Sequence, residues 1–168
     1  MRPRSWGEIL RRTDRPAGII LSRQDLRIVA RGDEYSSAEG VARGGYVVKE
    51  ASDKPRLILI ASGSEVSLAL EAAAKLEEDN IPTRVVSMPC MEWFDEQAPE
   101  YRNSVLPKDV KARVSIEAGI AMGWGRYVGD AGASISIEHF GASAAGVKCF
   151  EEFGFTVENV IKTARSVL

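Results

Sequence analysis

The chain has 168 residues, the length of about one domain, and its 22 Lys and Arg against 24 Asp and Glu give a net charge of −2. This balance excludes the strongly basic composition typical of nucleic-acid-binding domains. Two distant cysteines and a single histidine exclude a disulfide framework and a His-rich metal centre. No apolar run reaches the roughly 18 residues of a membrane span, and no apolar signal segment follows the arginine-rich start. We therefore expect a cytoplasmic protein with no membrane or nucleic-acid partner.

The first 43 residues predict a helix, a strand and a long connection. Trp6, Ile9 and Leu10 recur at near-helical spacing, which predicts a short helix over about residues 5–12. Gly18–Ser22 is an apolar, β-branched run and predicts a buried strand. Residues 23–43 are polar and have no steady period, so we expect a long connection and place a domain boundary there.

From Gly44 onward, strand and helix patterns alternate. Tyr46–Lys49 and Leu57–Ala61 are strand candidates separated by a turn-like segment, and this spacing predicts an antiparallel hairpin. The other expected elements are a helix ending near Glu78, strands over Thr83–Ser87, Ala112–Glu117 and Ser134–Ile137, two short helical pieces between Glu92 and Leu106, and helices over about Ser143–Glu152 and from Thr156 onward. Because helices separate most strands, we predict an α/β fold: a five-stranded, mostly parallel sheet with one antiparallel strand and helices on both faces.

The first candidate site lies between the second of these strands and its helix. Ser62 and Glu65 have the S-x-x-E spacing of a capping box, and a helix N-terminus can also bind an anion. The segment is neither G-x-G-x-x-G nor a Walker loop, and the acid at Glu65 opposes a phosphate. We interpret it as a capped start of a helix.

Three further features of the sequence could serve either chemistry or structure. Glu117 ends a strand where doubly wound sheets bind ligands, or it is an acid that ties down the following loop. The glycines from Gly119 to Gly132 fit no phosphate-binding motif and indicate a packed loop. His139 beside Glu138 could act as a general acid or base, but no nucleophile motif accompanies it, so a structural role is favoured.

The two cysteines, Cys90 and Cys149, are interpreted as small apolar side chains, since nothing nearby favours a lowered thiol pKa. Arg23 follows directly on the predicted Gly18–Ser22 strand. An arginine fixed at a strand end is suited to bind a phosphate through two parallel hydrogen bonds, although a surface arginine fits the pattern equally well. The residues by themselves predict no catalytic set, no metal cluster and no nucleotide loop.

Several strings, taken together and in order, resemble the C-terminal part of the transketolase family, over roughly Arg15 to Leu168. They are Ile20–Leu26, Ala38–Val47, Ile60–Val66, Arg84–Pro89, Ile116–Gly119, Trp124–Gly129, Phe140–Ala144 and Phe150–Thr156. The resemblance implies that residues 1–24 are a remnant of the pyrimidine-binding domain, comprising a helix and its last strand. Residues 25–43 would be the inter-domain linker and residues 44–168 the C-terminal domain. The first fifteen residues match the family poorly, as a truncated or misplaced start would.

The family resemblance also implies an activity. Transketolases transfer a two-carbon ketol unit from a ketose phosphate to an aldose phosphate, use thiamine diphosphate with Mg²⁺ or Ca²⁺, and act as homodimers. One functional residue carries over: Arg23, in Leu-Ser-Arg-Gln, matches the arginine that binds the phosphate of the sugar. His139 stands where another residue type is expected in the family, which argues further against a catalytic role.

The family's Gly-Asp-Gly metal and diphosphate motif, its cofactor-activating glutamate and its substrate histidines have no counterpart in these residues. We therefore expect no catalytic, cofactor-binding or metal-binding residue here and no transketolase activity from this chain alone. The expected role is a structural, dimer-supporting domain that docks on the remaining transketolase domains. The alternatives are a non-catalytic module for assembly or for a regulatory ligand, and one subunit of a split transketolase.

Overall fold

The computed structural model describes residues 4–29, 31–32 and 34–168. Its centre is a five-stranded sheet in the order β1-β3-β2-β4-β5, in which β1 is antiparallel to β3 and the other neighbours are parallel. The strands are β1 (Tyr46–Lys49), β2 (Leu57–Ala61), β3 (Thr83–Ser87), β4 (Arg113–Ile116) and β5 (Ala133–Ile135). The predicted α/β class, with its single antiparallel strand, is confirmed.

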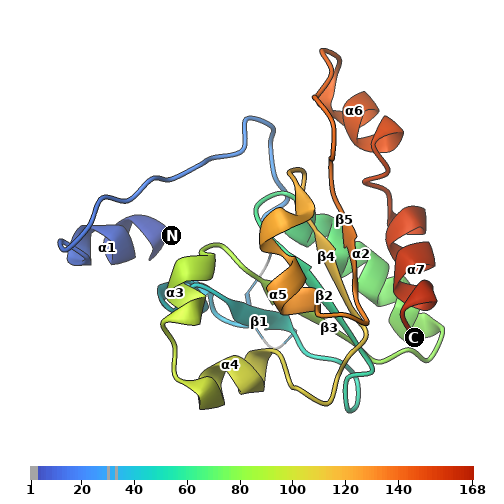
Figure 1. Ribbon diagram of the computed structural model, residues 1–168, viewed down its shortest axis with the longest axis horizontal. Helices are drawn as coiled ribbons and strands as arrows, with labels where there is room; N and C mark the ends of the chain where they lie inside the picture. Colours follow the sequence, from blue (N-terminus) through green and yellow to red (C-terminus); the bar gives the residue numbers. More distant parts are fainter. Residues whose placement is uncertain (1–3, 30, 33) are drawn as a thin grey trace.

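Helices cover both faces of the sheet, as predicted. Figure 1 shows α2 and α7 on one face, α3, α4 and α5 on the other, and α1 beyond α3 at the end of a long extended segment. The helical segments are α1 (Arg4–Arg11), η1 (Ala38–Arg43), α2 (Glu65–Glu78), α3 (Met91–Asp95), α4 (Pro99–Val105), η2 (Ala121–Gly123), α5 (Gly125–Val128), α6 (Gly146–Glu152) and α7 (Val157–Ser166). None of the helices in the described residues is long and apolar enough to cross a membrane.

The core is organised around β2. All five of its residues, Leu57–Ala61, are completely buried, because both faces of this central strand are covered by helices. On one face, the small side chains Ala69, Ala72 and Ala73 of α2 are also fully buried, together with Val160 of α7. Small residues allow the two helices to approach closely, and this contact joins the C-terminal helix to the sheet.

The predicted hairpin between β1 and β2 is wrong. Tyr46 of β1 pairs with Ser87 of β3, whereas β2 lies between β3 and β4 and is parallel to both. The apolar run of β2 explains the difference, since a strand buried on both faces takes a central position between parallel neighbours. The antiparallel strand β1 therefore forms the edge of the sheet beside β3. The connection from β1 to β2 passes the end of β3 at which Thr83 lies.

The predicted buried strand at Gly18–Ser22 is also absent from the described residues. This segment is extended but unpaired, with Ile20 fully exposed and Leu21 73% exposed. A short apolar run becomes a strand only where neighbouring strands complete its hydrogen bonds, and the sheet formed by these residues does not extend to it. Residues 1–3, 30 and 33, which belong to the predicted remnant and linker, lie outside the described residues.

The remaining boundaries differ from the predictions by a few residues. The strand predicted over Ser134–Ile137 ends at Ile135, and the helix predicted from Ser143 begins at Gly146. The last helix begins after Thr156 as predicted, because the Thr156 Oγ1 accepts a hydrogen bond of 3.2 Å from the Asn159 amide.

Candidate functional site

The carboxyl ends of β2 and β4 form the point where the sheet topology reverses. From β2 the chain returns to β3 on one side, and from β4 it continues to β5 on the other. Open α/β sheets bind ligands at such points. Here Ser62, directly after β2, donates a hydrogen bond of 2.6 Å to Oε2 of Glu117, directly after β4. Both readings of Glu117 remain compatible with this arrangement.

The predicted capping box is wrong in its geometry. Ser64, not Ser62, stands at the N-cap position of α2, and its side chain makes no capping hydrogen bond. Glu65 is only 4% exposed, and its Oε1 accepts a hydrogen bond of 3.1 Å from Ser64 Oγ. Burial is the main cause that raises the pKa of Glu65, the negative charge of Glu117 raises it further, and hydrogen bonds from its own backbone and from Ser64 oppose the rise.

This Ser62–Glu65–Glu117 cluster does not fit the metal or the diphosphate that the family resemblance implies. It offers two carboxylates, and no group of three His, Cys, Asp or Glu side chains that could hold a metal occurs among the described residues. Mg²⁺ and Ca²⁺ need several oxygen ligands around one point, and two carboxylates repel a diphosphate. The cluster therefore acts within the fold as a polar link between two strand ends.

Arg23 lies in the extended segment between α1 and η1 and is exposed, so among the described residues it is not fixed at the end of a strand as predicted. Within the described part of the chain, no hydrogen bond or ion pair joins it to the Ser62–Glu65–Glu117 cluster. The two candidate sites of the sequence are therefore separate features. The exposed position leaves the Arg23 guanidinium accessible to a ligand or to another domain.

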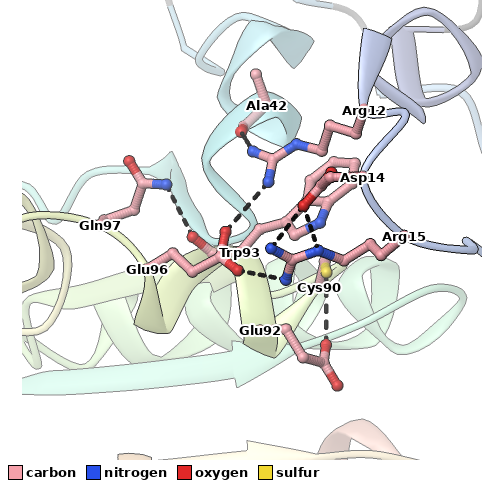
Figure 2. Close-up of polar contacts among 9 residues, drawn as sticks. All are labelled: Arg12, Asp14, Arg15, Ala42, Cys90, Glu92, Trp93, Glu96 and Gln97. Atoms are coloured by element: carbon pink, nitrogen blue, oxygen red, sulfur yellow. Dashed lines mark hydrogen bonds and ion pairs between the residues drawn. The ribbon is translucent and has the colours of Figure 1, made fainter. Parts of the chain in front are cut away.

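A group of contacts that the sequence analysis missed holds the segment before Arg23 against the domain. Figure 2 shows Arg12 and Arg15 converging on Glu96, which follows α3. Arg12 lies 3.2 Å and Arg15 2.7 Å from the Glu96 carboxylate. The Arg12 guanidinium also stacks 4.0 Å from the ring centre of Trp93 and donates to the Ala42 carbonyl at 3.3 Å. We call these residues the Glu96 clamp.

The clamp joins residues that are more than 80 positions apart, so no local spacing could reveal it. Its one visible signal is the pair of arginines at positions 12 and 15. Each exposed ion pair contributes little by itself, but a cation over an indole ring adds about 0.5–1 kcal/mol or more. The segment leading to Arg23 is therefore held at one end by several weak contacts.

Among the described residues, no hydrogen bond or ion pair joins His139 to an acid. Its Nδ1 lies 2.7 Å from the Phe140 carbonyl, and its ring meets Phe153 edge-on at 4.9 Å. The nearby Glu138 instead accepts a hydrogen bond of 2.8 Å from the Ala121 amide. These contacts support the structural reading of His139.

The remaining candidates also have structural roles. Burial raises the pKa of the Cys90 thiol, which agrees with its reading as an unreactive apolar side chain. In the glycine-rich loop, a Cβ on Gly132 would lie 2.5 Å from the Val128 carbonyl oxygen and 2.6 Å from that of Arg113. The prediction of a closely packed loop is confirmed at this position and is wrong at Gly125 and Gly129, where a Cβ would meet no atom within 4 Å.

The sheet order and the helices on both faces define an α/β domain. A family model described as "Transketolase-like TK C-terminal domain" matches residues 44–156. The chain therefore belongs to the transketolase family, as its sequence motifs indicated.

Relatives and solved structures agree with this assignment. The chain is 48% identical to a transketolase of Mycobacterium leprae and 49% identical to transketolase 1 of Vibrio vulnificus, over 98% of its own length and 24% of theirs. It thus spans about a quarter of these relatives, and the alignments include most of the first fifteen residues, which were expected to match poorly. Transketolase from Leishmania mexicana superposes with a TM-score of 0.72 at 45% identity, covering 79% of this chain and 19% of that one. A transketolase mutant from Pichia stipitis gives 0.75 at 38% identity, covering 86% and 20%.

Proposed function

We propose that this chain supplies the C-terminal part of an active transketolase. The complete enzyme transfers a two-carbon ketol unit from a ketose phosphate to an aldose phosphate in the pentose phosphate pathway. It works in the cytoplasm as a homodimer, with thiamine diphosphate and Mg²⁺ or Ca²⁺ held by its other domains. In this proposal the residues of this chain bind and position substrate and the neighbouring domains, and the other domains hold both groups.

The observation that carries this proposal is the extent of the match. Identity of 48–49% extends over 98% of the chain, so it includes the segment before the family-model match at residues 44–156. That segment contains the Leu21-Ser22-Arg23-Gln24 string. Arg23 in this string is exposed, as binding of a substrate requires.

Arg23 is proposed to bind the phosphate group of the sugar substrate. A guanidinium presents planar, paired N–H donors that match two phosphate oxygens. In this proposal residues 1–24 belong to the pyrimidine-binding domain, residues 25–43 are the linker and residues 44–168 are the C-terminal domain. The exposed side chains of Ile20 and Leu21 would then be covered by the sheet of the pyrimidine-binding domain.

The test uses a full-length transketolase that ends in these residues. Arg23→Ala should raise the Michaelis constant for a phosphorylated donor by about 10- to 100-fold, because one charge-assisted interaction of roughly 1.5–3 kcal/mol is lost. The rate with a donor that lacks the phosphate should stay unchanged. Arg27→Ala, at another exposed arginine of the same segment, is the matched control. An unchanged Michaelis constant in Arg23→Ala would contradict the assignment.

A separate measurement addresses the chain by itself. With thiamine diphosphate, Mg²⁺ and pentose phosphates, the purified 168-residue chain should form no sedoheptulose 7-phosphate, since in this proposal both cofactors are held by the other domains. Formation of this product would refute the proposal that the other domains hold the cofactors.

The second candidate function is an assembly or regulatory-ligand module, or one subunit of a split enzyme. Large apolar side chains exposed on the described surface favour association, including Ile20, Leu21, Met122 and Phe140. A solved structure titled "Split gene transketolase, inactive beta4 tetramer" shares the fold, with a TM-score of 0.58 at 23% identity. Light scattering of the purified chain shows whether it forms a stable oligomer. If that oligomer gains transketolase activity when a separate partner polypeptide is added, the split enzyme is favoured.

A further inference from the structure

A pocket is lined by residues of α3, α4, β4 and α5. These helices lie on the sheet face opposite α2 and α7 (Figure 1). Its volume of about 330 Å³ is at the lower end of the range for small-molecule sites. Two of its walls are the buried aromatic side chains Phe94 and Tyr127, which are 2% and 4% exposed. We call it the α4–α5 pocket.

The charged residues of this pocket are unbalanced. Four cationic side chains line it, and Asp95 is its one acidic side chain. The cations are Arg102, Lys108, Arg113 and Arg126. The pocket thus carries a formal excess of three positive charges in a chain whose net charge is −2. A concave surface of one sign focuses the potential and attracts the opposite charge.

Asp95 does not neutralise the excess. Its carboxylate lies 2.8 Å from the Arg126 guanidinium and accepts a hydrogen bond of 3.0 Å from the Tyr127 hydroxyl. In the described part of the chain, no carboxylate forms an ion pair with Arg102, Lys108 or Arg113. Three cations therefore face the pocket without a protein counter-ion among these residues.

Arg113 is held in place by the backbone. Its guanidinium donates to four carbonyls, those of Leu106, Pro107, Val110 and Tyr127, at 2.8–3.3 Å. An arginine has five N–H donors, so four carbonyls leave one N–H of Arg113 without a protein acceptor among the described residues. Burial lowers the pKa of Arg113, because its charge is partly removed from water without an opposite charge beside it. The result is a fixed positive charge at the wall of the pocket.

We propose that the α4–α5 pocket binds a phosphate group, either as free phosphate or as a phosphate ester. Its cations come from α4, from the loop after it, from β4 and from α5, so they approach from several directions. This arrangement suits a tetrahedral dianion with several acceptor oxygens better than a planar carboxylate. The aromatic walls leave room for an apolar or sugar portion of an ester. The site is distinct from Arg23 and does not depend on the proposed function.

The test uses the 168-residue chain carrying Arg23→Ala, so that binding at Arg23 does not contribute. Inorganic phosphate, ribose 5-phosphate and ribose are titrated at low ionic strength, and the ¹H–¹⁵N signals of Tyr127 and of the Arg113 Nε are followed. Both phosphates should shift these signals saturably, whereas ribose should not. Replacing both Arg102 and Lys108 by Gln should weaken binding at least tenfold. Lys111→Gln, at an exposed lysine that does not line the pocket, should leave affinity unchanged.

The two phosphates identify the source. Tighter binding of ribose 5-phosphate assigns an ester to the pocket, and equal affinity assigns free phosphate. The proposal is overturned if the signals shift linearly without saturation, or if the double variant binds as tightly as its parent. Both variants change exposed side chains, and the unperturbed spectrum of each in the absence of phosphate verifies that it is folded.

Discussion

Ser62 and Glu117 join the carboxyl ends of two neighbouring parallel strands through a hydrogen bond of 2.6 Å between their side chains. The residues are 55 positions apart, yet they follow directly on β2 and β4. Glu65 lies beside them, buried at the start of α2. The three side chains therefore connect the centre of the sheet to its main covering helix.

Removal of the Ser62 hydroxyl should destabilise the chain. In Ser62→Ala the Glu117 carboxylate loses a charge-assisted hydrogen bond in a partly buried setting, which should lower the free energy of unfolding by about 1–2 kcal/mol. Urea unfolding followed by circular dichroism measures the change. Ser67→Ala, within α2, is the control and should be neutral or slightly stabilising, because alanine is the better helix former. Equal effects of the two changes would contradict a specific role for the Ser62–Glu117 bond.

Glu65 should make stability fall as the pH rises. Its folded-state pKa is raised above the ordinary value of 4.5, chiefly by burial, so the folded chain binds this proton more tightly than the unfolded chain does. The stability that Glu65 contributes is therefore present below pH 4.5 and is lost as the pH rises through the raised pKa.

Glu65→Gln removes this dependence. The variant should be more stable than the parent at pH 8, by on the order of 1 kcal/mol, and the difference should shrink toward pH 4. Urea unfolding at the two pH values measures it, with Glu71→Gln, at an exposed position of the same helix, as control. A difference that is the same at both pH values would show that the charge of Glu65 is not responsible.

Local patterns predicted the elements well where local physics decides them. The strand Thr83–Ser87 and the start of α7 after Thr156 were found because a β-branched run and a capping threonine act over a few residues. The capping box at Ser62 failed although its spacing was right. A glutamate 55 residues away provides a better partner for that hydroxyl, and no local rule can anticipate it.

The hairpin and the Gly18–Ser22 strand failed for a different reason. Whether two strands pair depends on which other strands compete for the same edges. Leu57–Ala61 is apolar at every position, which is typical of a central strand buried on both faces. This pattern is stronger evidence for a central position than the short turn-like segment before it is for a hairpin. In the candidate site, Arg23 is exposed on an unpaired segment and not at a strand end, while the Glu96 clamp depends on tertiary contacts alone.

Gly44 marks the point where the chain enters the domain, and it should not tolerate a side chain. Its φ is +78°, and a Cβ there would lie 2.3 Å from both the Cys90 carbonyl oxygen and the Phe94 amide nitrogen. Gly44→Ala should therefore destabilise the chain by roughly 3 kcal/mol, through backbone strain together with displacement of α3.

Gly125→Ala is the matched control for this change. No heavy atom lies within 4 Å of a Cβ built there, and the residue begins α5. The control should change the free energy of unfolding by about 1 kcal/mol at most, in the stabilising direction. Thermal unfolding of the two variants compares them, and a Gly44→Ala chain as stable as the control would contradict the close packing of α3 on Gly44.

The Glu96 clamp should govern the opening of the N-terminal segment without governing global stability. Glu96→Gln removes the charge that both Arg12 and Arg15 approach, while the stacking of Arg12 on Trp93 remains possible. Exposed ion pairs contribute up to about 1 kcal/mol, which corresponds to roughly a fivefold change in a local opening equilibrium. The global free energy of unfolding should change by less than about 0.5 kcal/mol.

Two measurements separate these effects. Amide hydrogen exchange over residues 4–15 should become roughly fivefold faster in Glu96→Gln, and trypsin should cleave after Arg11 and Arg12 sooner. Glu100→Gln, at an exposed acid of α4 with no ion pair among the described residues, should leave both rates unchanged. If exchange of residues 4–15 is equally fast in the parent, the control and Glu96→Gln, the carboxylate of Glu96 does not hold the segment. Faster exchange confined to this segment in Glu96→Gln would show that the clamp sets how firmly the chain before Arg23 is attached to the domain.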